Sequence, residues 1–359
     1  MQRGADMTVS ILTGADIGTL LCPEGPRRQP MTGFDETYRD VVDYIIRCTF
    51  RIWEEKDIGL IATHYAPDCP IHTATGTVAG VDTVTAGTVK TLAGFPDRTL
   101  YGEAVIWSGD EKTGYLSSHR IVSHGTNLGP SEFGAATGKR VCFTTIADCL
   151  CRENRIVEEW LVRDNAAIAL QLGLIPRAIA RDQARADRLT SVAPQAWRID
   201  AIESLRARTI SPFPERTPPS STTPDAFARW VFDTIWTHRR LAGVRDIYAP
   251  NAHWAGPSGR RLFGWGEITG WIVAIVASFP DARICVDHVA SVETPRGREI
   301  AVRWRLAGHH EGVALYGAES HRDVLILAVT HWLVDAERIV EETTIFDEIA
   351  LLRQIEGGL

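Results

Sequence analysis

The sequence predicts a duplicated α+β fold: two tandem domains that each combine three helices with an antiparallel sheet. The first observation is a repeat, because residues 155–159 recur without change 183 positions later as residues 338–342. In both copies the strand continues to an aspartate, Asp164 or Asp347. The second observation is a change of period: each copy passes from helical spacing to runs of β-branched and aromatic residues. Helices followed by an antiparallel meander are typical of α+β domains.

The composition limits the domain count and the partners. A chain of 359 residues with 45% hydrophobic and 23% charged residues can bury two cores. Its formal net charge of −7 argues against a nucleic-acid partner, which would require a basic surface. The seven cysteines lack the spacing of a zinc site, so we expect reduced thiols and no metal. Neither a membrane span nor a signal peptide is predicted, and we therefore expect a cytoplasmic protein.

The first copy is expected to follow a poorly ordered N-terminal tail, residues 1–34. Apolar residues recur with helical spacing from Asp35 to Arg51, and shorter helices are expected at Asp57–His64 and Val81–Leu92. Four strands are predicted after them: Thr99–Trp107, Tyr115–Ser123, Arg140–Leu150 and Ile156–Val162. The first domain is therefore expected to span residues 35–178.

A helical and proline-rich linker is predicted between the copies, at residues 179–222. Its first part, Ile179–Arg208, is charged and rich in alanine, whereas Thr209–Pro224 carries five prolines and cannot build a core. The second domain, residues 223–359, begins with Thr223 as a helix cap and proline at the first helical position. Its predicted strands are Arg283–Val292, Ile300–Ala307, Val324–Val334 and Ile339–Phe346.

A sheet curved around helices is expected to enclose a pocket, and alternate residues of each strand point into it. Asp148 and its equivalent His331 lie on strand sides that are otherwise apolar. A titratable group in such a place is costly unless it is hydrogen-bonded or used, which makes both residues candidate acids or bases. The alternative is a satisfied buried polar group or an outward-facing side chain.

Asp164 and Asp347 are the other catalytic candidates, because each closes the last strand of its copy. At the apolar mouth of a pocket, desolvation would raise the pKa of such a carboxyl group and allow proton transfer near neutral pH. Each aspartate also precedes a predicted helix, so it could instead cap free backbone donors. The two roles can coexist.

Histidines and tryptophans supply the candidate substrate contacts. His119 lies in a strand of the first copy, and His309 lies at the matching end in the second. His309 and His310 are adjacent and point apart on a strand, which argues against a shared metal. His72 and His253 follow equivalent Tyr-Ala-Pro segments, although either could be a surface residue. Tryptophans can build a core or form the wall of a flat apolar ligand site, and the candidates are Trp160, Trp254, Trp271 and Trp304.

Four segments together resemble the SnoaL-like polyketide cyclases and ester cyclases of the nuclear transport factor 2-like superfamily. They are Trp53 with Tyr65-Ala66-Pro67-Asp68, then Phe95-Pro96-Asp97, Ala136–Val141 and Arg155–Asp164. The similarity covers residues 35–175 well and residues 224–356 less fully. In the second copy Thr343 replaces Trp160, and residues 319–323 replace the Thr-Gly-Lys-Arg segment.

The resemblance implies a cone of helices closed by a strongly curved antiparallel sheet, with a pocket inside and no cofactor. Family members commonly pair through the outer face of the sheet, so the two cones are expected to form an internal pseudo-dimer, with a further homo-oligomer possible. In the cyclases the aspartate that closes the last strand acts with a histidine of the neighbouring strand. Carried over, this implies Asp347 with His331, and Asp164 with Asp148 in place of the histidine.

The leading hypothesis is a cofactor-independent acid–base enzyme of the cyclase, isomerase, lyase or hydrolase type. It would act on a small, largely apolar carbonyl or hydroxyl compound. The alternative is a non-catalytic small-molecule-binding or assembly module of the same fold, because this fold hosts several functions. A pocket filled by the protein's own side chains would favour the alternative.

Overall fold

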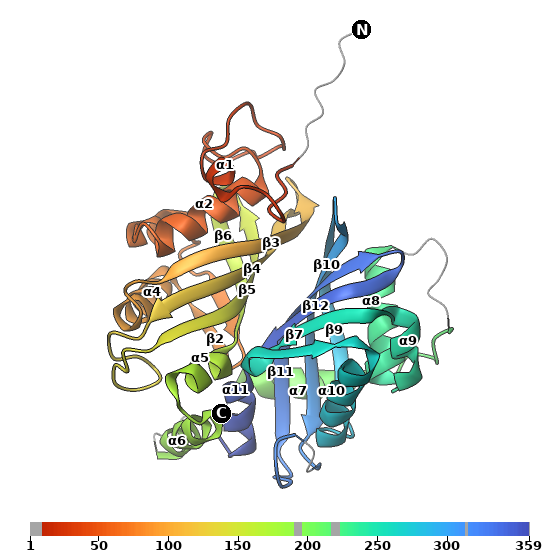
Figure 1. Ribbon diagram of the computed structural model, residues 1–359. Coiled ribbons are helices and arrows are strands. Elements are labelled where there is room, and N and C mark those ends of the chain that lie inside the picture. Colours follow the sequence, from red (N-terminus) through yellow and green to blue (C-terminus); the bar gives the residue numbers. More distant parts are fainter. Residues whose placement is uncertain (1–8, 190–195, 217–222, 313–314, 359) are drawn as a thin grey trace. The chain divides into compact units, whose positions relative to one another are not determined.

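The computed structural model describes residues 9–189, 196–216, 223–312 and 315–358. By its contacts the chain falls into two compact units (Figure 1). Unit 1 consists of Met1–His72 and Thr77–Leu161, and unit 2 of Thr73–Gly76 and Val162–Leu359. Each unit contains a six-stranded sheet with helices against it, so the predicted fold class of two tandem α+β domains is confirmed. The predicted domain bounds and the internal pseudo-dimer stay predictions.

The first sheet has the strand order β2-β1-β6-β5-β4-β3, and β3, β4 and β5 pair antiparallel as predicted. Its strands are β1 (Pro70–Thr73), β2 (Gly76–Ala79), β3 (Thr99–Asp110), β4 (Gly114–Thr126), β5 (Arg140–Arg152) and β6 (Arg155–Arg163). The helices of unit 1 are α1 (Ile17–Leu21), α2 (Val41–Trp53), α3 (Ile61–His64) and α4 (Val81–Gly94).

The second sheet repeats this topology in the order β8-β7-β12-β11-β10-β9. Its strands are β7 (Tyr248–Gly256), β8 (Arg260–Phe263), β9 (Arg283–Thr294), β10 (Gly297–His309), β11 (Asp323–Asp335) and β12 (Arg338–Phe346). The helices of unit 2 are α5 (Asn165–Leu172), α6 (Pro176–Leu189), α7 (Ala196–Arg206), α8 (Pro224–Phe232), α9 (Val244–Ile247), α10 (Gly264–Ser278) and α11 (Glu348–Ile355).

Two strands of each sheet, β1 and β2 in the first and β7 and β8 in the second, escaped the sequence prediction. In the second sheet β7 pairs in parallel with β12 and antiparallel with β8. In the first sheet β1 pairs in parallel with β6. Strand β7 contains Pro250 and Asn251, residues that are depleted in strands, and β1 and β2 have four residues each. Composition alone therefore indicated loops at these places.

Capping residues set the starts of the helices. Helix α2 begins at Val41 and not near Asp35, because Asp40 is its N-cap and accepts a hydrogen bond from the Asp43 amide at 2.9 Å. Helix α8 begins as predicted, with Thr223 as N-cap and Pro224 in the first turn.

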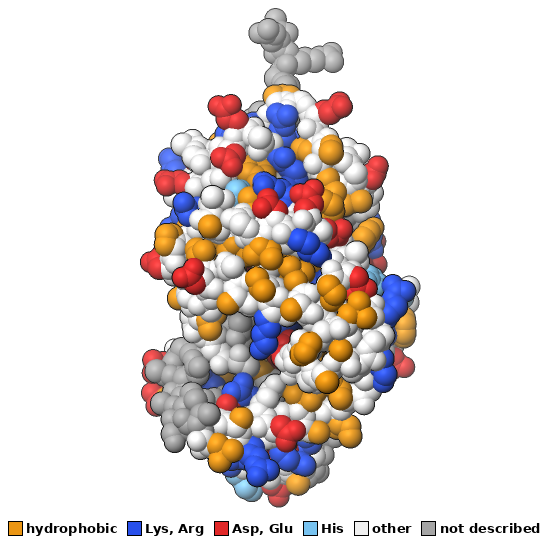
Figure 2. Space-filling model, turned by 90° about the vertical axis from the view of Figure 1, so that its left-hand side faces the viewer, with side chains coloured by type: hydrophobic (Ala, Val, Ile, Leu, Met, Phe, Trp, Pro, Cys, Tyr) orange, Lys and Arg blue, Asp and Glu red, His pale blue; other side chains and the backbone are white. Residues whose placement is uncertain are grey.

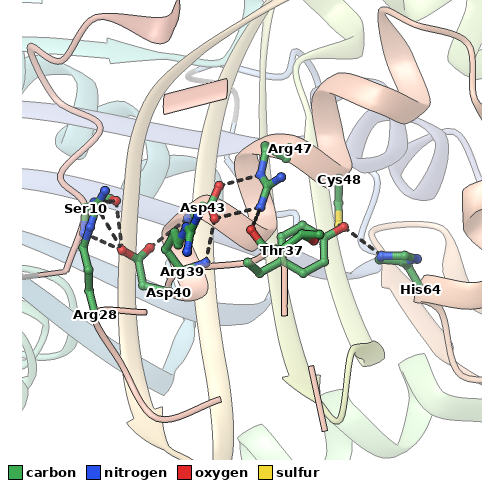
Figure 3. A network of polar contacts seen from close by, with 10 residues as sticks. Ser10, Arg28, Thr37, Arg39, Asp40, Asp43, Arg47, Cys48 and His64 are labelled. Atoms are coloured by element: carbon green, nitrogen blue, oxygen red, sulfur yellow. Dashed lines mark hydrogen bonds and ion pairs between the residues drawn. The ribbon is translucent and has the colours of Figure 1, made fainter. Parts of the chain in front are cut away.

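Residues 9–34 pack on unit 1, contrary to the expectation of a poorly ordered tail; residues 1–8 lie outside the described part of the chain. Four apolar side chains of this segment are buried in the core of unit 1: Leu12, Leu20, Met31 and Phe34. Ser10 donates to Asp40 from both its amide and its hydroxyl at 2.9 Å, and Arg28 contacts both residues (Figure 3). The apolar residues of this segment follow no regular period, so the sequence pattern did not reveal their packing.

The predicted helical linker forms two helices, α6 and α7. Helix α7 is not a spacer, because its apolar side chains join a buried cluster with three residues of the second sheet. The members of this cluster are Ala201, Ile202, Leu205, Cys285, Ala307 and Leu325. Residues 190–195 and 217–222 of the predicted linker lie outside the described residues.

Charged side chains of both signs are interspersed with apolar ones on the face shown in Figure 2. Within the described residues, we find no helix that combines the length and the apolarity needed to cross a membrane.

Candidate functional site

Unit 2 encloses a small cavity between its helices and its sheet. Eight aromatic side chains line it: Phe232, Trp236, Tyr248, Trp254, Trp271, Trp304, Trp332 and Phe346. The other lining residues are aliphatic apart from Thr330, Thr344 and Glu342. The free volume is about 20 Å³, which is room for about one water molecule. The protein's own side chains therefore fill most of the space inside this cone.

Glu342 is the carboxylate of this aromatic cavity, and it is only 9% exposed. Its Oε1 atom accepts hydrogen bonds from Trp254 Nε1 at 2.8 Å and from the Thr344 hydroxyl at 2.6 Å. Its Oε2 atom accepts from Trp332 Nε1 at 2.9 Å and from the Tyr248 hydroxyl. Burial and the adjacent Glu342 raise the pKa of Tyr248 well above its ordinary value, so this hydroxyl remains a donor. Four donors compensate the carboxylate for the water that it loses on burial.

A chain of hydroxyl groups extends from Glu342 along the cavity wall that the sheet forms. The Thr344 hydroxyl lies 2.7 Å from the Thr330 hydroxyl, which accepts a hydrogen bond from Trp304 Nε1 at 2.9 Å. Hydroxyl hydrogens can rotate, so each threonine can donate or accept. The chain ends at the Trp304 indole, which only donates, so its two hydroxyl groups can rearrange hydrogen bonds beside Glu342.

His331 lies on the side of its strand that faces away from the cavity. Thr330 and Trp332 of β11 line the cavity, so His331 between them points to the opposite face of the sheet, where it is buried. The expectation that His331 faces the pocket is therefore wrong for this cavity. Both faces of β11 are buried, and apolar neighbours alone could not show which one faces inward. Asp148, the equivalent residue on β5, is likewise buried, and its neighbours Ala147 and Cys149 belong to or pack on the core of unit 1.

Asp347 and Asp164 are helix caps, the role that the sequence left open beside catalysis. Asp347 caps α11, accepting hydrogen bonds from the amides of Ile349 at 2.9 Å and Ala350 at 3.1 Å. It also accepts one from Asn165 Nδ2 at 2.6 Å. It follows β12 and does not line the aromatic cavity.

Asp164 caps α5 and also holds a turn of unit 2. It accepts hydrogen bonds from the amides of Ala167 at 3.0 Å, Ser258 at 2.7 Å and Gly259 at 2.9 Å. The two turn residues have left-handed backbones, with φ of 62° and 68°, which aims their amides at one point. Burial raises the pKa of Asp164, and these hydrogen bonds oppose that shift. Asp164 therefore has the capping role that the sequence left open beside catalysis.

Unit 1 has its own buried glutamate at the equivalent position. Glu159 accepts a hydrogen bond from the Tyr65 hydroxyl at 3.1 Å, as Glu342 does from Tyr248. The three further donors of the second copy are replaced by apolar residues at the equivalent positions of the first copy: Ile71, Cys149 and Leu161. Desolvation therefore raises the pKa of Glu159 to about 7.

His119 also lies inside unit 1. It is buried, its Nδ1 atom lies 3.5 Å from the Thr49 hydroxyl, and desolvation lowers its pKa to about 3. It is therefore neutral at physiological pH.

The remaining predicted contacts are brought together only in part. Trp254, Trp271 and Trp304 line the aromatic cavity. His72 instead stacks on Trp160 in unit 1, with ring centroids 5.2 Å apart, and contacts Glu158 at 2.9 Å. His253 is exposed beside Phe263, and His309 lies 2.6 Å from Asp323 near the surface. Among the described residues, no cluster of three or more His, Cys, Asp or Glu side chains suits a metal ion.

The sequence interpretation missed Glu342, Tyr248, Thr330, Thr344 and Trp332. A signal for the first two was present, because the Glu and Tyr recur unchanged in both copies. The tryptophan and threonine partners occur in the second copy alone, and only the strand register shows that they face Glu342.

Comparison with family models identifies the class of protein. The model of the SnoaL-like polyketide cyclases matches residues 44–172 and again residues 227–355, and the two matches are separated by the same offset as the repeat in the sequence. The chain therefore belongs to the SnoaL-like polyketide cyclase family, in two tandem copies with the nuclear transport factor 2-like fold, and the predicted resemblance is confirmed.

The solved structures that are similar to this chain each cover less than half of it. TsrD from Streptomyces laurentii is 18% identical and covers 37% of this chain and 96% of its own, with a TM-score of 0.33. IdmH from Streptomyces antibioticus is 22% identical, covers 37% and 99%, and has a TM-score of 0.32. A SnoaL-like polyketide cyclase from Agrobacterium tumefaciens is 16% identical and covers 37% and 98%, with a TM-score of 0.32. A comparison with curated proteins gave no match.

Proposed function

We propose that this protein is a cofactor-independent acid–base enzyme of the cyclase or isomerase type, and that the cone of unit 2 is its working site. The observation that carries the proposal is Glu342, a carboxylate held by four side-chain donors inside an aromatic cavity. Membership of a cyclase family supports the same reaction type. The catalytic assignment thus moves from Asp347 and His331 to Glu342.

The geometry gives each cavity group a role. Glu342 would accept a proton from a carbon next to a carbonyl group, and the rotatable hydroxyls of Thr330 and Thr344 would donate to the substrate oxygen as charge develops there. The tryptophan faces suit a flat, largely apolar substrate. Because the cavity is small, the aromatic side chains must move to admit it.

Proton exchange on a model ketone tests this proposal. The probe is 2-tetralone, a flat apolar ketone, and the measurement is NMR of hydrogen–deuterium exchange next to its carbonyl in D₂O. Glu342→Gln keeps the side-chain shape and removes the base, so the protein-dependent exchange rate should fall by about 10²–10⁴-fold. The matched control is Glu159→Gln at the equivalent position of unit 1, which should leave the rate unchanged. An unchanged rate in Glu342→Gln would refute the role of Glu342.

A small-molecule-binding module without chemistry is the second candidate, and the cavity volume of about 20 Å³ favours it. The same experiment separates the two. If 2-tetralone quenches the tryptophan fluorescence of the wild-type protein but its exchange stays at the buffer rate, the protein binds without catalysing.

A further inference from the structure

A second hollow lies beside the aromatic cavity in unit 2. This groove has a free volume of about 210 Å³ and is formed by the end of α7 with residues 208–211, by α8 and the turn after it, and by the start of β9. Its lining includes Arg208, Ser211, Arg229, Arg283 and Cys285. It is much larger than the aromatic cavity, and its wall is more polar.

Phe232 lines both hollows. It is the last residue of α8, and a π-helical turn, η2 (Asp233–Thr237), follows it directly. Such turns interrupt the regular hydrogen bonding of a helix and often occur at functional sites. On the cavity side the Phe232 ring packs against Trp304 and Trp332, with centroids 5.3 Å and 5.8 Å away. A rotation of this ring would join the groove to the cavity.

The first copy has the same place filled. Gly102 pairs with Ile121 in the first sheet, and Val286 pairs with Trp304 in the second. Trp304 is the residue of the second copy that corresponds to Ile121. Gly102 is therefore the equivalent of Val286, which lines the groove. At Gly102 a methyl group would come within 3.0 Å of the Leu12 side chain and 3.4 Å of Ile46.

Ile46 is the equivalent of Arg229, so Leu12 from the N-terminal segment occupies the position of the groove in unit 1. Ser10 and Arg28 fasten this segment at Asp40 (Figure 3). The position of the groove is therefore filled by a side chain in the first copy and is vacant in the second.

The groove carries excess positive charge. Arg229 is engaged by both carboxylate oxygens of Asp225, at 2.9 Å and 3.0 Å. Arg208 and Arg283, by contrast, form no ion pair with any carboxylate among the described residues. Asp233 is the acidic residue of the lining, and it accepts a hydrogen bond from Thr237. Two uncompensated guanidinium groups against one carboxylate favour an anionic group at this wall.

We infer that this groove is the entrance to the aromatic cavity, that Phe232 is its gate, and that Arg208 and Arg283 select substrates with a carboxylate or another anionic substituent on a flat apolar body. This inference rests on the proposed working site in unit 2. The anionic end would stay in the groove while the apolar body passes Phe232 toward Glu342.

Binding kinetics with a matched pair of probes test the inference. The probes are 2-naphthoate, which is anionic, and 2-naphthamide, which has the same shape without the charge. Stopped-flow tryptophan fluorescence gives the association and dissociation rates. Ser211→Trp should fill the groove and slow association and dissociation of both probes about tenfold or more. Phe232→Leu should speed association and dissociation together, which is the signature of a gate.

Charge selection has its own variant and control. Arg283→Gln should slow the association of 2-naphthoate by about tenfold and leave 2-naphthamide unchanged. The control is Arg261→Gln, which removes an exposed arginine of β8 that does not line the groove. Circular dichroism and thermal unfolding show whether each variant is folded.

Two results would overturn the proposal that the groove is the entrance. One is an unchanged association rate in folded Ser211→Trp, and the other is no binding of either probe to the wild-type protein. Equal association of the two probes would overturn the anionic preference. Because these rates do not depend on proton transfer, they can fail while the Glu342→Gln exchange result holds, and the reverse is also possible.

Discussion

Replacing Glu159 by glutamine should change how the stability of the protein depends on pH. Burial raises the pKa of this carboxyl group from an ordinary 4.5 to about 7 in the folded protein. Between these two values the folded protein keeps the proton that the unfolded chain loses. Its contribution to stability is therefore complete below pH 4.5 and is lost as the pH rises through about 7. Glutamine resembles the protonated acid at every pH, so the variant avoids this loss.

The magnitude follows from the difference between the two pKa values. A difference of about 2.5 corresponds to roughly 3 kcal/mol of unfolding free energy, at about 1.36 kcal/mol for each pH unit. The free energy of unfolding of Glu159→Gln minus that of wild type should therefore rise by roughly 3 kcal/mol from pH 4.5 to pH 7.5. The Tyr65 hydroxyl still has a carbonyl acceptor in the variant, so its hydrogen bond is kept.

Urea unfolding of the variant and the wild-type protein at a series of pH values measures this difference in unfolding free energy. The contributions of all other titrating groups are the same in both proteins and cancel in the difference. His119→Gln provides a comparison with the opposite sign. Desolvation lowers the pKa of His119 from 6.5 to about 3, so its contribution is complete above pH 6.5 and is lost as the pH falls toward 3. A difference for Glu159→Gln that stays flat from pH 4.5 to 7.5 would show that this carboxyl group is not desolvated as the structure indicates.

Three further substitutions probe the caps, the N-terminal segment and the hydroxyl chain. Asp164→Ala leaves three backbone amides without their acceptor and should lower the free energy of unfolding in urea by about 2–4 kcal/mol. The Glu342-dependent exchange rate should stay unchanged, and a loss of rate beyond tenfold would restore Asp164 as a catalytic candidate. Gly102→Ala brings a methyl group within 3.0 Å of Leu12 and His119 and should lower the free energy of unfolding by about 1–3 kcal/mol. In a double-mutant cycle, Leu12→Ala should recover part of this loss, and strictly additive losses would contradict the packing. Thr344→Val breaks the hydroxyl chain beside Glu342 and should lower the exchange rate while the protein remains folded in circular dichroism.

The fold was predictable because its signals are local and repeated. Helical spacing in α2, alternating strands from β3 to β6 and the recurrence of both in the second copy are all visible in the chain. The packing of residues 9–34 was not, because Leu12 and Phe34 reach the core from a segment without a period. Strands β1 and β7 escaped because their parallel partners, β6 and β12, lie far away in the sequence.

The site was harder to predict, because a strand with two buried faces does not reveal which face lines a cavity. On β11 every residue from Val324 to Leu333 is buried, so His331 and Trp332 look alike in the sequence. The choice of His331 over its neighbour moved the predicted site to the opposite side of the sheet. The register between β11 and β12 settles the question, since it places Trp332 opposite Glu342.

The two copies give their equivalent buried glutamates different surroundings. Glu342 meets three indole or hydroxyl donors besides tyrosine, which suit the role of base that we propose for it. At the same three positions around Glu159 the first copy has isoleucine, cysteine and leucine, so the glutamate keeps its proton up to about pH 7 and packs as a neutral group. Leu12 fills the position of the entrance in that copy. Restoring the donors in unit 1 would therefore not be enough to create a second working site, because the substrate would still lack a way in.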